Sequence, residues 1–509
     1  MLPPGSPTMP TAPNVLLAIA DDWSAPHAGA YGCPWVSTPA FDRVAAAGLL
    51  FTRAHTPDAK CAPSRAALLT GRNPWQLEAA ANHWCYFPAH YRTWPEALRA
   101  AGLHVGFTGK GWAPGVANDA EGQPRQLTGR PYYGKTIDPP TPDIARNDYA
   151  GNFATFLDEA PADQPWFFWY GGLEPHRRYT YGSGTELGGR TIDEIDQVPA
   201  CWPDTPEVRQ DMLDYAFEVE HFDRHLGLIL DQIEAAGQLD NTLVIVTSDN
   251  GYPFPHAKGN TYADACRVPL AMAWAEGIAH PGQVRDEYVS LIDIAPTIAA
   301  ACDFDLAAGG LAPITGQSLA PLLAAAPDER PAGLRGHVLL GRERHDVGRP
   351  LDQGYPVRGV VRDEWLYLHN YEPTRWPGCN PETGYWDTDS SPTKTAVLAT
   401  RRDPAQRHHW QACFGLRPAH ELYDLSSDPY CMTNLAETEP HAARRAAMDE
   451  LLLHDLLAQE DPRAMGQGHV FDAYPYADEK MRGYYEQWAA GTPPPSPWFE
   501  AGDVDPDPD

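Results

Sequence analysis

The chain has few basic residues for its size. Lysine and arginine number 38 against 68 aspartate and glutamate residues, giving a formal net charge of −30 over 509 residues. Nucleic acids and anionic membrane surfaces repel so acidic a protein, so we expect neither as a partner. An anionic substrate would also be repelled, and its site would have to concentrate basic groups locally.

The nine cysteines form no recognisable framework. Their number is odd, no CxxC occurs, and their spacing fits neither a zinc site nor a set of disulfides. Residues 1–13 lack the basic start and apolar stretch of a signal peptide, and no apolar run is long enough to span a membrane. The sequence therefore predicts a cytoplasmic protein, although a mature chain without its leader would read the same way.

Strand and helix patterns alternate over most of the chain. This alternation predicts an α/β fold with a mostly parallel sheet flanked by helices. Apolar residues make up 43% of the chain, and its length exceeds what one core usually supports. Buried strands are predicted at 14–20, 105–108, 166–170, 242–247, 269–274 and 337–340, and helices at 38–47, 64–70, 94–101 and 212–236.

The pattern changes after about residue 352. A hairpin at 357–369, a strand at 421–425 and a helix at 442–459 predict a smaller C-terminal α+β domain with an antiparallel sheet. The end of the chain is rich in proline and aspartate and predicts an extended or disordered tail. We therefore divide the chain into a large domain over 1–352, a smaller domain over 353–490 and a tail over 491–509.

The most informative stretch begins at Cys61 and reads CAPSRAALLTGR. Taken alone, a cysteine before Pro63 and Ser64 is also typical of a buried thiol where a loop turns into a helix capped by the serine. A residue at a helix N-terminus lies in a positive field, which suits a polarised nucleophile or a bound anion. The first five residues leave both interpretations open.

Two acidic pairs follow predicted strands: Asp21-Asp22 after the first, and Asp249-Asn250 after the strand at 242–247. The carboxyl ends of parallel strands meet at one edge of a sheet, where sites form. Either pair alone could cap a helix, but together their oxygens suit Ca²⁺ or Mg²⁺.

These motifs together resemble the formylglycine-dependent sulfatases. In that family a formylglycine-generating enzyme oxidises the cysteine that matches Cys61 to an aldehyde, whose hydrate attacks sulfur and then expels sulfate. The resemblance implies an alkaline-phosphatase-like fold, a sulfated sugar or glycan fragment as substrate, and Ca²⁺ as cofactor. Its implied metal ligands are Asp21, Asp22, modified Cys61, Asp249 and Asn250.

The resemblance also implies catalytic roles. Arg65 would hold the hydrated aldehyde and offset charge at the metal. Lys110 and Lys258 would bind the sulfo group, and Asp249 would accept the proton of the nucleophile. His176 would protonate the leaving group with help from Lys258.

The chain departs from the family pattern at Trp112. Many sulfatases have a histidine two residues after the lysine that matches Lys110, and that histidine helps to release sulfate. The sequence leaves this role unassigned.

Segments 203–206, 247–255 and 288–298 resemble the heparan N-sulfatase (sulfamidase) branch of the family. This resemblance favours a sulfate ester or sulfamate on a sugar such as N-sulfoglucosamine, and it leaves a homodimer open. Loop positions predict substrate contacts at His83, Arg177, His345 and Asp346.

Two other functions compete with this one. A phosphonate monoester or phosphate diester hydrolase can use the same constellation. A non-catalytic sulfated-glycan-binding protein would keep Cys61 unmodified, although it would have no need of the metal ligands.

Overall fold

A computed structural model describes residues 12–495 and 500–505. Its centre is an eight-stranded sheet in the order β11-β2-β10-β9-β1-β8-β5-β7. All neighbours pair in parallel except β10, which is antiparallel to both β9 and β2. The strands are β1 (Asn14–Ala20), β2 (Leu49–Phe51), β5 (His104–Gly109), β7 (Arg130–Pro131), β8 (Trp166–Gly171), β9 (Thr242–Ser248), β10 (Leu270–Ala273) and β11 (Gln283–Arg285).

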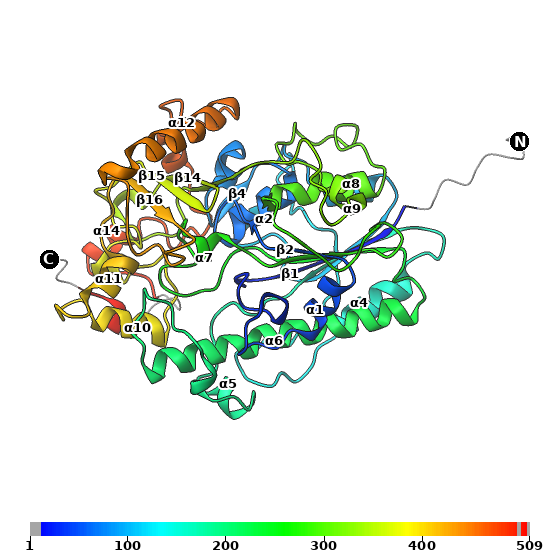
Figure 1. The fold of residues 1–509 in the computed structure, drawn as a ribbon, viewed down its shortest axis with the longest axis horizontal. Coiled ribbons are helices and arrows are strands. Elements are labelled where there is room, and N and C mark those ends of the chain that lie inside the picture. The colour runs from blue at the N-terminus through cyan, green and yellow to red at the C-terminus, as the bar shows by residue number, and fades with distance from the viewer. Residues whose placement is uncertain (1–11, 496–499, 506–509) are drawn as a thin grey trace, which may run out of the picture.

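The central strand β1 separates two hydrophobic cores. Because side chains alternate along a strand, Leu16 and Ala18 face one core, whereas Leu17 and Ile19 face the other. Helices α1 (Pro39–Ala46), α4 (Tyr149–Glu159) and α6 (Pro206–Ala235) cover the first face, and α2 (Cys61–Thr70), α3 (Trp94–Ala100) and α8 (Ile294–Ala301) cover the second (Figure 1). The predicted α/β fold with a mostly parallel sheet is confirmed.

The long helix α6 begins at Pro206, earlier than the predicted start at residue 212. Thr205 precedes it, and its side chain accepts a hydrogen bond from the backbone N–H of Val208. A capping threonine followed by proline is a strong helix start.

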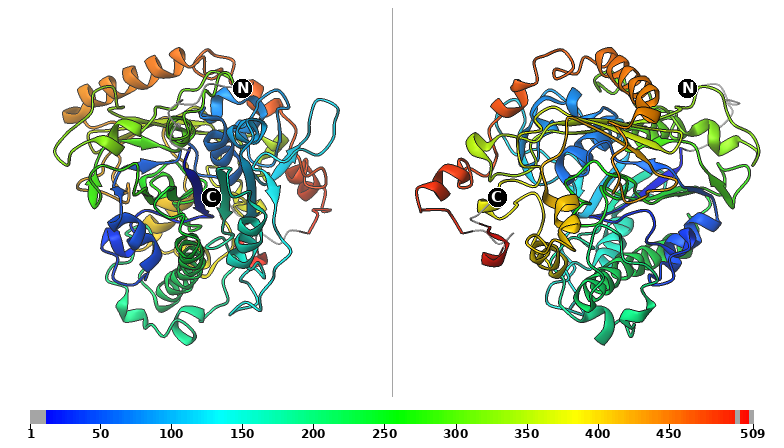
Figure 2. Two further views of the ribbon diagram at one scale, coloured as in Figure 1. Left: turned by 90° about the vertical axis from the view of Figure 1, so that its right-hand side faces the viewer. Right: turned by 60° about the vertical axis from the view of Figure 1, so that its left-hand side comes forward.

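A four-stranded antiparallel sheet forms the smaller unit. It consists of β13 (Val338–Arg342), β14 (Val357–Arg362), β15 (Trp365–Asn370) and β16 (His420–Asp424), and α12 (Ala442–Ala458) packs on it (Figures 1 and 2). The first of these strands precedes residue 352. The smaller sheet therefore takes its first strand from the part of the chain that we assigned to the large domain.

The chain returns to the large core after β15. Helices α10 (Pro392–Ala399) and α11 (Arg407–Phe414) pack Val397, Trp410 and Phe414 into the same core as α6. The shorter elements are β3 (Ala54–His55), β4 (Cys85–Phe87), β6 (Gly115–Ala117), β12 (Val289–Ser290), α5 (Ser183–Glu186), α7 (Ala263–Cys266), α9 (Ala320–Ala324), α13 (His469–Ala473) and α14 (Tyr484–Ala489).

The prediction of an extended or disordered tail is wrong for residues 500–505. Asp503 is 1% exposed, and its carboxylate lies 3.2 Å from the Nζ atom of the buried Lys394 on α10. Composition predicts an unstructured segment here, but a specific buried ion pair holds it. Residues 496–499 and 506–509 of the predicted tail lie outside the described residues. Within the described ranges, no helix has both the length and the apolarity to cross a membrane.

Candidate active site

Helix α2 begins at Cys61, which is 2% exposed. Ser64, which the buried-thiol interpretation made the helix cap, lies inside the helix. Its hydroxyl instead donates to the backbone oxygen of Asp249, at 2.5 Å, and accepts from Thr56, at 2.8 Å. Residue 61 is thereby held at the helix N-terminus, directly beside the carboxyl end of β9.

The two acidic pairs meet as the parallel pairing predicts. Ala20 of β1 lies opposite Ser248 of β9, so Asp21-Asp22 and Asp249-Asn250 emerge side by side. The backbone N–H of Asp22 donates to Asp249 Oδ1 at 3.1 Å, and carboxylate oxygens of Asp21, Asp22 and Asp249 lie within 4.8 Å of one another. Asp22 adopts a left-handed backbone (φ 78°), which is uncommon outside glycine and typical of functional turns.

This oxygen cluster fits a hard divalent cation. Asn250 Oδ1 is buried and has no hydrogen-bond partner among the described residues, which leaves it available as a ligand. In the absence of a cation, burial raises the pKa of Asp249 to about 7, with Asp21 adding to the effect and Arg65 opposing it. Three carboxylates and an amide oxygen are the donors that Ca²⁺ and Mg²⁺ prefer, and the sulfur of Cys61 lies 3.4 Å from Asp21 Oδ1.

Buried basic groups surround the carboxylates. Arg65 binds Asp249 Oδ2 through Nε at 2.7 Å, and Lys110 Nζ lies 2.5 Å from Asp21 Oδ2. Lys258 Nζ lies 2.6 Å from Asp22 Oδ2. Burial disfavours ionisation of Asp21, but Lys110 and Arg65 outweigh it and hold the pKa of this carboxyl well below its usual range. The local concentration of basic groups that an anionic substrate requires is therefore present.

Gly109 places Lys110 at the end of β5. A Cβ atom at this glycine would lie 1.9 Å from the backbone oxygen of Gly171, and its φ is +72°. Only glycine adopts this left-handed backbone readily and also lacks the Cβ atom that would clash with Gly171. The close approach lets the Lys110 N–H donate to the Gly171 oxygen at 2.7 Å.

His176 follows β8 and lines the same cavity as Cys61. Its Nδ1 lies 2.7 Å from the backbone oxygen of Arg177, a contact that requires a proton on Nδ1. Its Nε2 lies 3.9 Å from Asp22 Oδ2. The ring therefore turns Nε2 toward the carboxylate of Asp22.

Trp112 occupies the position where the family usually has a histidine. Its indole N–H donates to the backbone oxygen of Ala62 at 3.1 Å, and its ring packs edge-on against Phe87. Trp112 thus supports the first turn of α2 and offers no group that can accept or give a proton to a substrate.

A cavity of about 470 Å³ joins these groups. It is lined by residues that the sequence predicted, including Asp21, Cys61, Lys110, His176 and Lys258, and by others that it missed. The missed lining residues include Lys60, Glu174, Glu218, Trp386 and Asp389. Asp389 comes from the loop before α10 and lies 3.2 Å from Lys258 Nζ. No sequence motif identifies the loop that carries Asp389. Lys60, in contrast, could have been predicted to line the cavity, because it directly precedes Cys61.

The predicted substrate contacts divide into two groups. His83 and Asp346 line the cavity, and Lys60 Nζ lies 2.8 Å from Asp346 Oδ2. Burial lowers the pKa of His83 to about 4 despite its contact with Asp346, so this imidazole is neutral at pH 7. His345, in contrast, is fully buried behind the wall, with Nε2 2.8 Å from Asp58 Oδ1, and the prediction that it contacts substrate is wrong in this structure.

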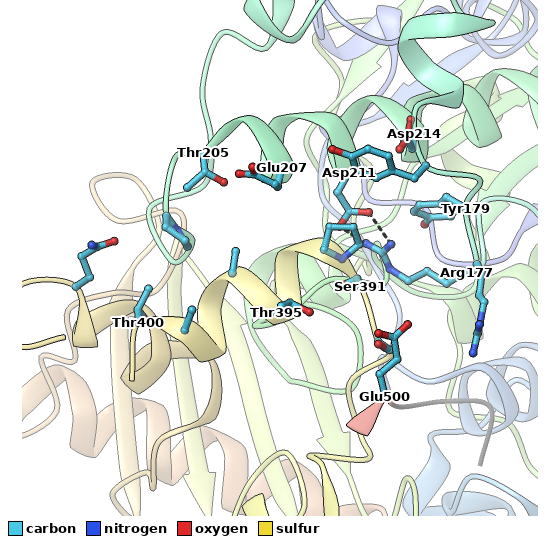
Figure 3. Close-up of a pocket in the computed structure, with 18 of the residues that line it drawn as sticks. Arg177, Tyr179, Thr205, Glu207, Asp211, Asp214, Ser391, Thr395, Thr400 and Glu500 are labelled. Carbon is cyan, nitrogen blue, oxygen red and sulfur yellow. Dashed lines mark hydrogen bonds and ion pairs between the residues drawn. The ribbon is translucent and has the colours of Figure 1, made fainter. Parts of the chain in front are cut away.

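Arg177 lines both this cavity and a neighbouring one of about 830 Å³ (Figure 3). Its NH1 and NH2 atoms bind Asp211 of α6 at 2.7 and 2.8 Å, and its Nε donates to the Pro253 oxygen. The Thr393 hydroxyl also donates to Asp211, at 2.6 Å. Arg177 was predicted to bind substrate, but each of its three guanidinium nitrogens makes a contact within the protein. Because Arg177 lines both cavities, its ion pair with Asp211 links the segment between them to α6.

Breaking this pair is expected to destabilise the fold. Arg177→Met leaves the carboxylate of Asp211 buried without its countercharge, which should cost about 3–5 kcal/mol of unfolding free energy. Arg43→Met removes two surface pairs, with Asp231 and Glu234, whose side chains are 66% and 63% exposed, and each should contribute only about 0–1 kcal/mol. Urea unfolding followed by tryptophan fluorescence measures both. Equal losses would contradict the structural role of the Arg177–Asp211 pair.

Sequence comparison shows that this chain is similar to known sulfatases. The family model described as Sulfatase matches residues 13–304. Human N-sulphoglucosamine sulphohydrolase is 31% identical over 479 residues, which cover 88% of this chain and 89% of the relative. Human arylsulfatase A is 29% identical over 61% of this chain and 68% of its own.

Solved structures show the same fold. One, in complex with its substrate D-glucosamine-2-N,6-O-disulfate, has a TM-score of 0.62 at 18% identity and covers 89% of this chain and 99% of its own. The phosphonate monoester hydrolase of Agrobacterium radiobacter has a TM-score of 0.57 at 20% identity, covering 88% and 96%. The chain has the alkaline-phosphatase-like fold, and it belongs to the sulfatase family.

Proposed function

We propose that this protein hydrolyses the N-sulfo group of N-sulfoglucosamine or a closely related sulfated sugar, after oxidation of Cys61 to formylglycine. The observation that carries the proposal is one cavity in which Cys61, a cluster of hard oxygen ligands, two buried lysines and His176 converge. The 31% identity to human N-sulphoglucosamine sulphohydrolase supports a sulfamate in particular.

The unmodified thiol is poorly suited to this chemistry. Burial first, and then the nearby Asp21 carboxylate, raise the pKa of Cys61 far above its usual range, so little thiolate forms at neutral pH. As formylglycine, residue 61 would supply a hydrated aldehyde, with one oxygen to attack sulfur and a second to release sulfate.

The surrounding residues orient and neutralise the sulfo group. Asp21, Asp22, Asp249 and Asn250 would hold Ca²⁺, which supplies positive charge next to the sulfo oxygens. Lys110 and Lys258 approach the same centre and stabilise charge that develops there.

Proton movement falls to two groups. Asp249 accepts a proton from the nucleophile, consistent with burial raising its pKa to about 7 in the absence of the cation. His176 would act as an imidazolium: it gives its Nε2 proton to the departing nitrogen or oxygen and becomes a neutral ring whose Nδ1–H stays on the Arg177 carbonyl.

Peptide mass spectrometry tests the modification. In protein from its native host, after alkylation of free thiols, the peptide with residue 61 should remain unalkylated and should weigh about 18 Da less than its unalkylated cysteine form, because alkylation separates a thiol from the hydrate of nearly equal mass. An unmodified thiol in protein that nevertheless hydrolyses sulfamates would contradict the proposal. An unmodified thiol in inactive protein would favour the glycan-binding alternative.

The reaction class is tested by substrate comparison. Turnover of N-sulfoglucosamine, an aryl sulfate and an aryl phosphonate monoester should be measured with the same preparation. The proposal expects the highest kcat/KM for the sulfamate, whereas a preference for the phosphonate would favour phosphonate or phosphodiester hydrolysis on the same site.

A further inference from the structure

Asp389 is a carboxylate of the catalytic cavity to which the proposed mechanism gives no role. It lies in the loop before α10 and lines the cavity together with Lys258 and His176. The side chain of Asp389 is 13% exposed and that of His176 is 21% exposed, whereas Lys258 is almost completely buried. A molecule in the cavity can therefore touch both Asp389 and His176.

Asp389 adjoins the group that protonates the leaving atom. A ring nitrogen of His176 and carboxylate oxygens of Asp22 and Asp389 lie within 4.8 Å of one another. Lys258 Nζ bridges the two carboxylates, at 2.6 Å from Asp22 Oδ2 and 3.2 Å from Asp389 Oδ2. Asp389 is thus next to His176 and Lys258, the two residues that the sulfatase resemblance assigns to the leaving group.

The neighbours of Asp389 keep it charged. Burial disfavours its ionisation, but Lys258, Lys60 and His176 outweigh burial and hold the pKa of this carboxyl below its usual range. A carboxylate accepts hydrogen bonds and donates none. Asp389 can therefore bind a substrate atom that carries a hydrogen, and it repels an atom that offers only lone pairs.

One leaving atom can reach both His176 and Asp389. At the upper limit of 4.8 Å between these groups, an atom with hydrogen bonds of about 2.9 Å to each meets them at about 110°, the angle between substituents on a tetrahedral atom. A sulfamate nitrogen suits both partners, because its lone pair takes a proton from His176 and its N–H donates to Asp389. The bridging oxygen of a sulfate ester carries no hydrogen and offers Asp389 only lone pairs.

We propose that Asp389 is a specificity-determining residue, which selects a sulfamate over a sulfate ester by accepting a hydrogen bond from the N–H of the scissile nitrogen. The S–N bond breaks with its electron pair on nitrogen, which takes the Nε2 proton of His176, while the original N–H stays on Asp389. This inference rests on the proposed function and assigns its preference for nitrogen to one residue.

Two sugars that differ at the scissile atom test the inference: N-sulfoglucosamine, with nitrogen between C2 and sulfur, and glucose 2-sulfate, with oxygen there. The quantity measured is the ratio of their kcat/KM values, sulfamate over ester. Asp389→Ala should lower this ratio at least about tenfold, because a charge-assisted hydrogen bond is lost for the sulfamate alone. Asp389→Asn keeps an acceptor without the charge and should lower the ratio about threefold.

The matched control is Asp231→Ala. It removes a 66% exposed carboxylate that is also paired with a basic side chain, Arg43, and it should leave the ratio within about twofold of the wild type. Any displacement of Lys258 in the Asp389 variants affects the sulfo group of both sugars and cancels in the ratio.

The outcomes separate the two claims. If folded Asp389→Ala lowers kcat/KM for both sugars by the same factor, Asp389 only positions Lys258, and the inference is overturned while the proposed function stands. Hydrolysis of neither sugar by formylglycine-containing wild-type protein would overturn both. If Asp389→Ala fails to fold, as judged by its melting curve, an unchanged ratio in Asp389→Asn overturns the inference.

Discussion

Cys61→Ala should reduce kcat/KM for N-sulfoglucosamine on the order of 10⁴-fold or more, since removal of a covalent nucleophile leaves only binding and electrostatic stabilisation. The cavity should still bind the sugar, because its lysines and His176 remain. The measurement is sulfate release over hours at high enzyme concentration, together with sugar binding by calorimetry.

The matched control for this variant is Cys302→Ala. Cys302 is half-buried at the end of α8, away from the cavity lining, and its loss should leave turnover within about twofold. If Cys61→Ala kept wild-type turnover, neither formylglycine nor a thiol could be the nucleophile.

Removal of the divalent cation should have the second large effect. Chelation should lower turnover about 10³-fold or more, since the sulfo group loses its strongest neighbouring charge, and Ca²⁺ should restore it. The cation should also raise the melting temperature, because it binds the folded state and relieves repulsion among Asp21, Asp22 and Asp249. If neither the melting temperature nor the turnover changed on addition of chelator or Ca²⁺, the prediction of a metal site would be wrong.

The affinity for Ca²⁺ should weaken as the pH falls. Without the cation, burial raises the pKa of Asp249 to about 7, so below that pH a proton occupies the carboxylate and must leave before the metal binds. Calcium titrations at pH 8 and pH 6 should show a lower dissociation constant at pH 8. Asp22→Asn should weaken binding at both, whereas Asp231→Asn, on the exposed surface of α6, should not.

Local patterns predicted that Asp21, Asp22, Asp249 and Asn250 lie together, because these residues follow strand ends. Asp21 and Asp249 come directly after buried strands, and parallel pairing of those strands brings them together. Cys61 and Arg65 lie one helical turn apart, so a single helix start positions both.

The rest of the cavity lining was predicted less well. His345 is next to a lining residue in the sequence but is buried against Asp58. Arg177 does line the cavity, but its guanidinium group is paired with Asp211. Glu218 and Asp389 line the cavity although neither lies in a motif. The positions of Glu218 and Asp389 depend on how α6 and the loop before α10 pack in the folded protein. No local sequence pattern predicts this packing.

The burial of residue 61 links enzyme yield to the order of events during synthesis. With Cys61 only 2% exposed and enclosed by α2 and the strand ends, a maturing enzyme cannot reach it once the chain has folded. Under the proposed function, oxidation and folding therefore compete, and each molecule that folds first would stay inactive until it unfolds. The active fraction of a preparation then depends on the ratio of two rates, so slower expression should increase specific activity without any change in sequence.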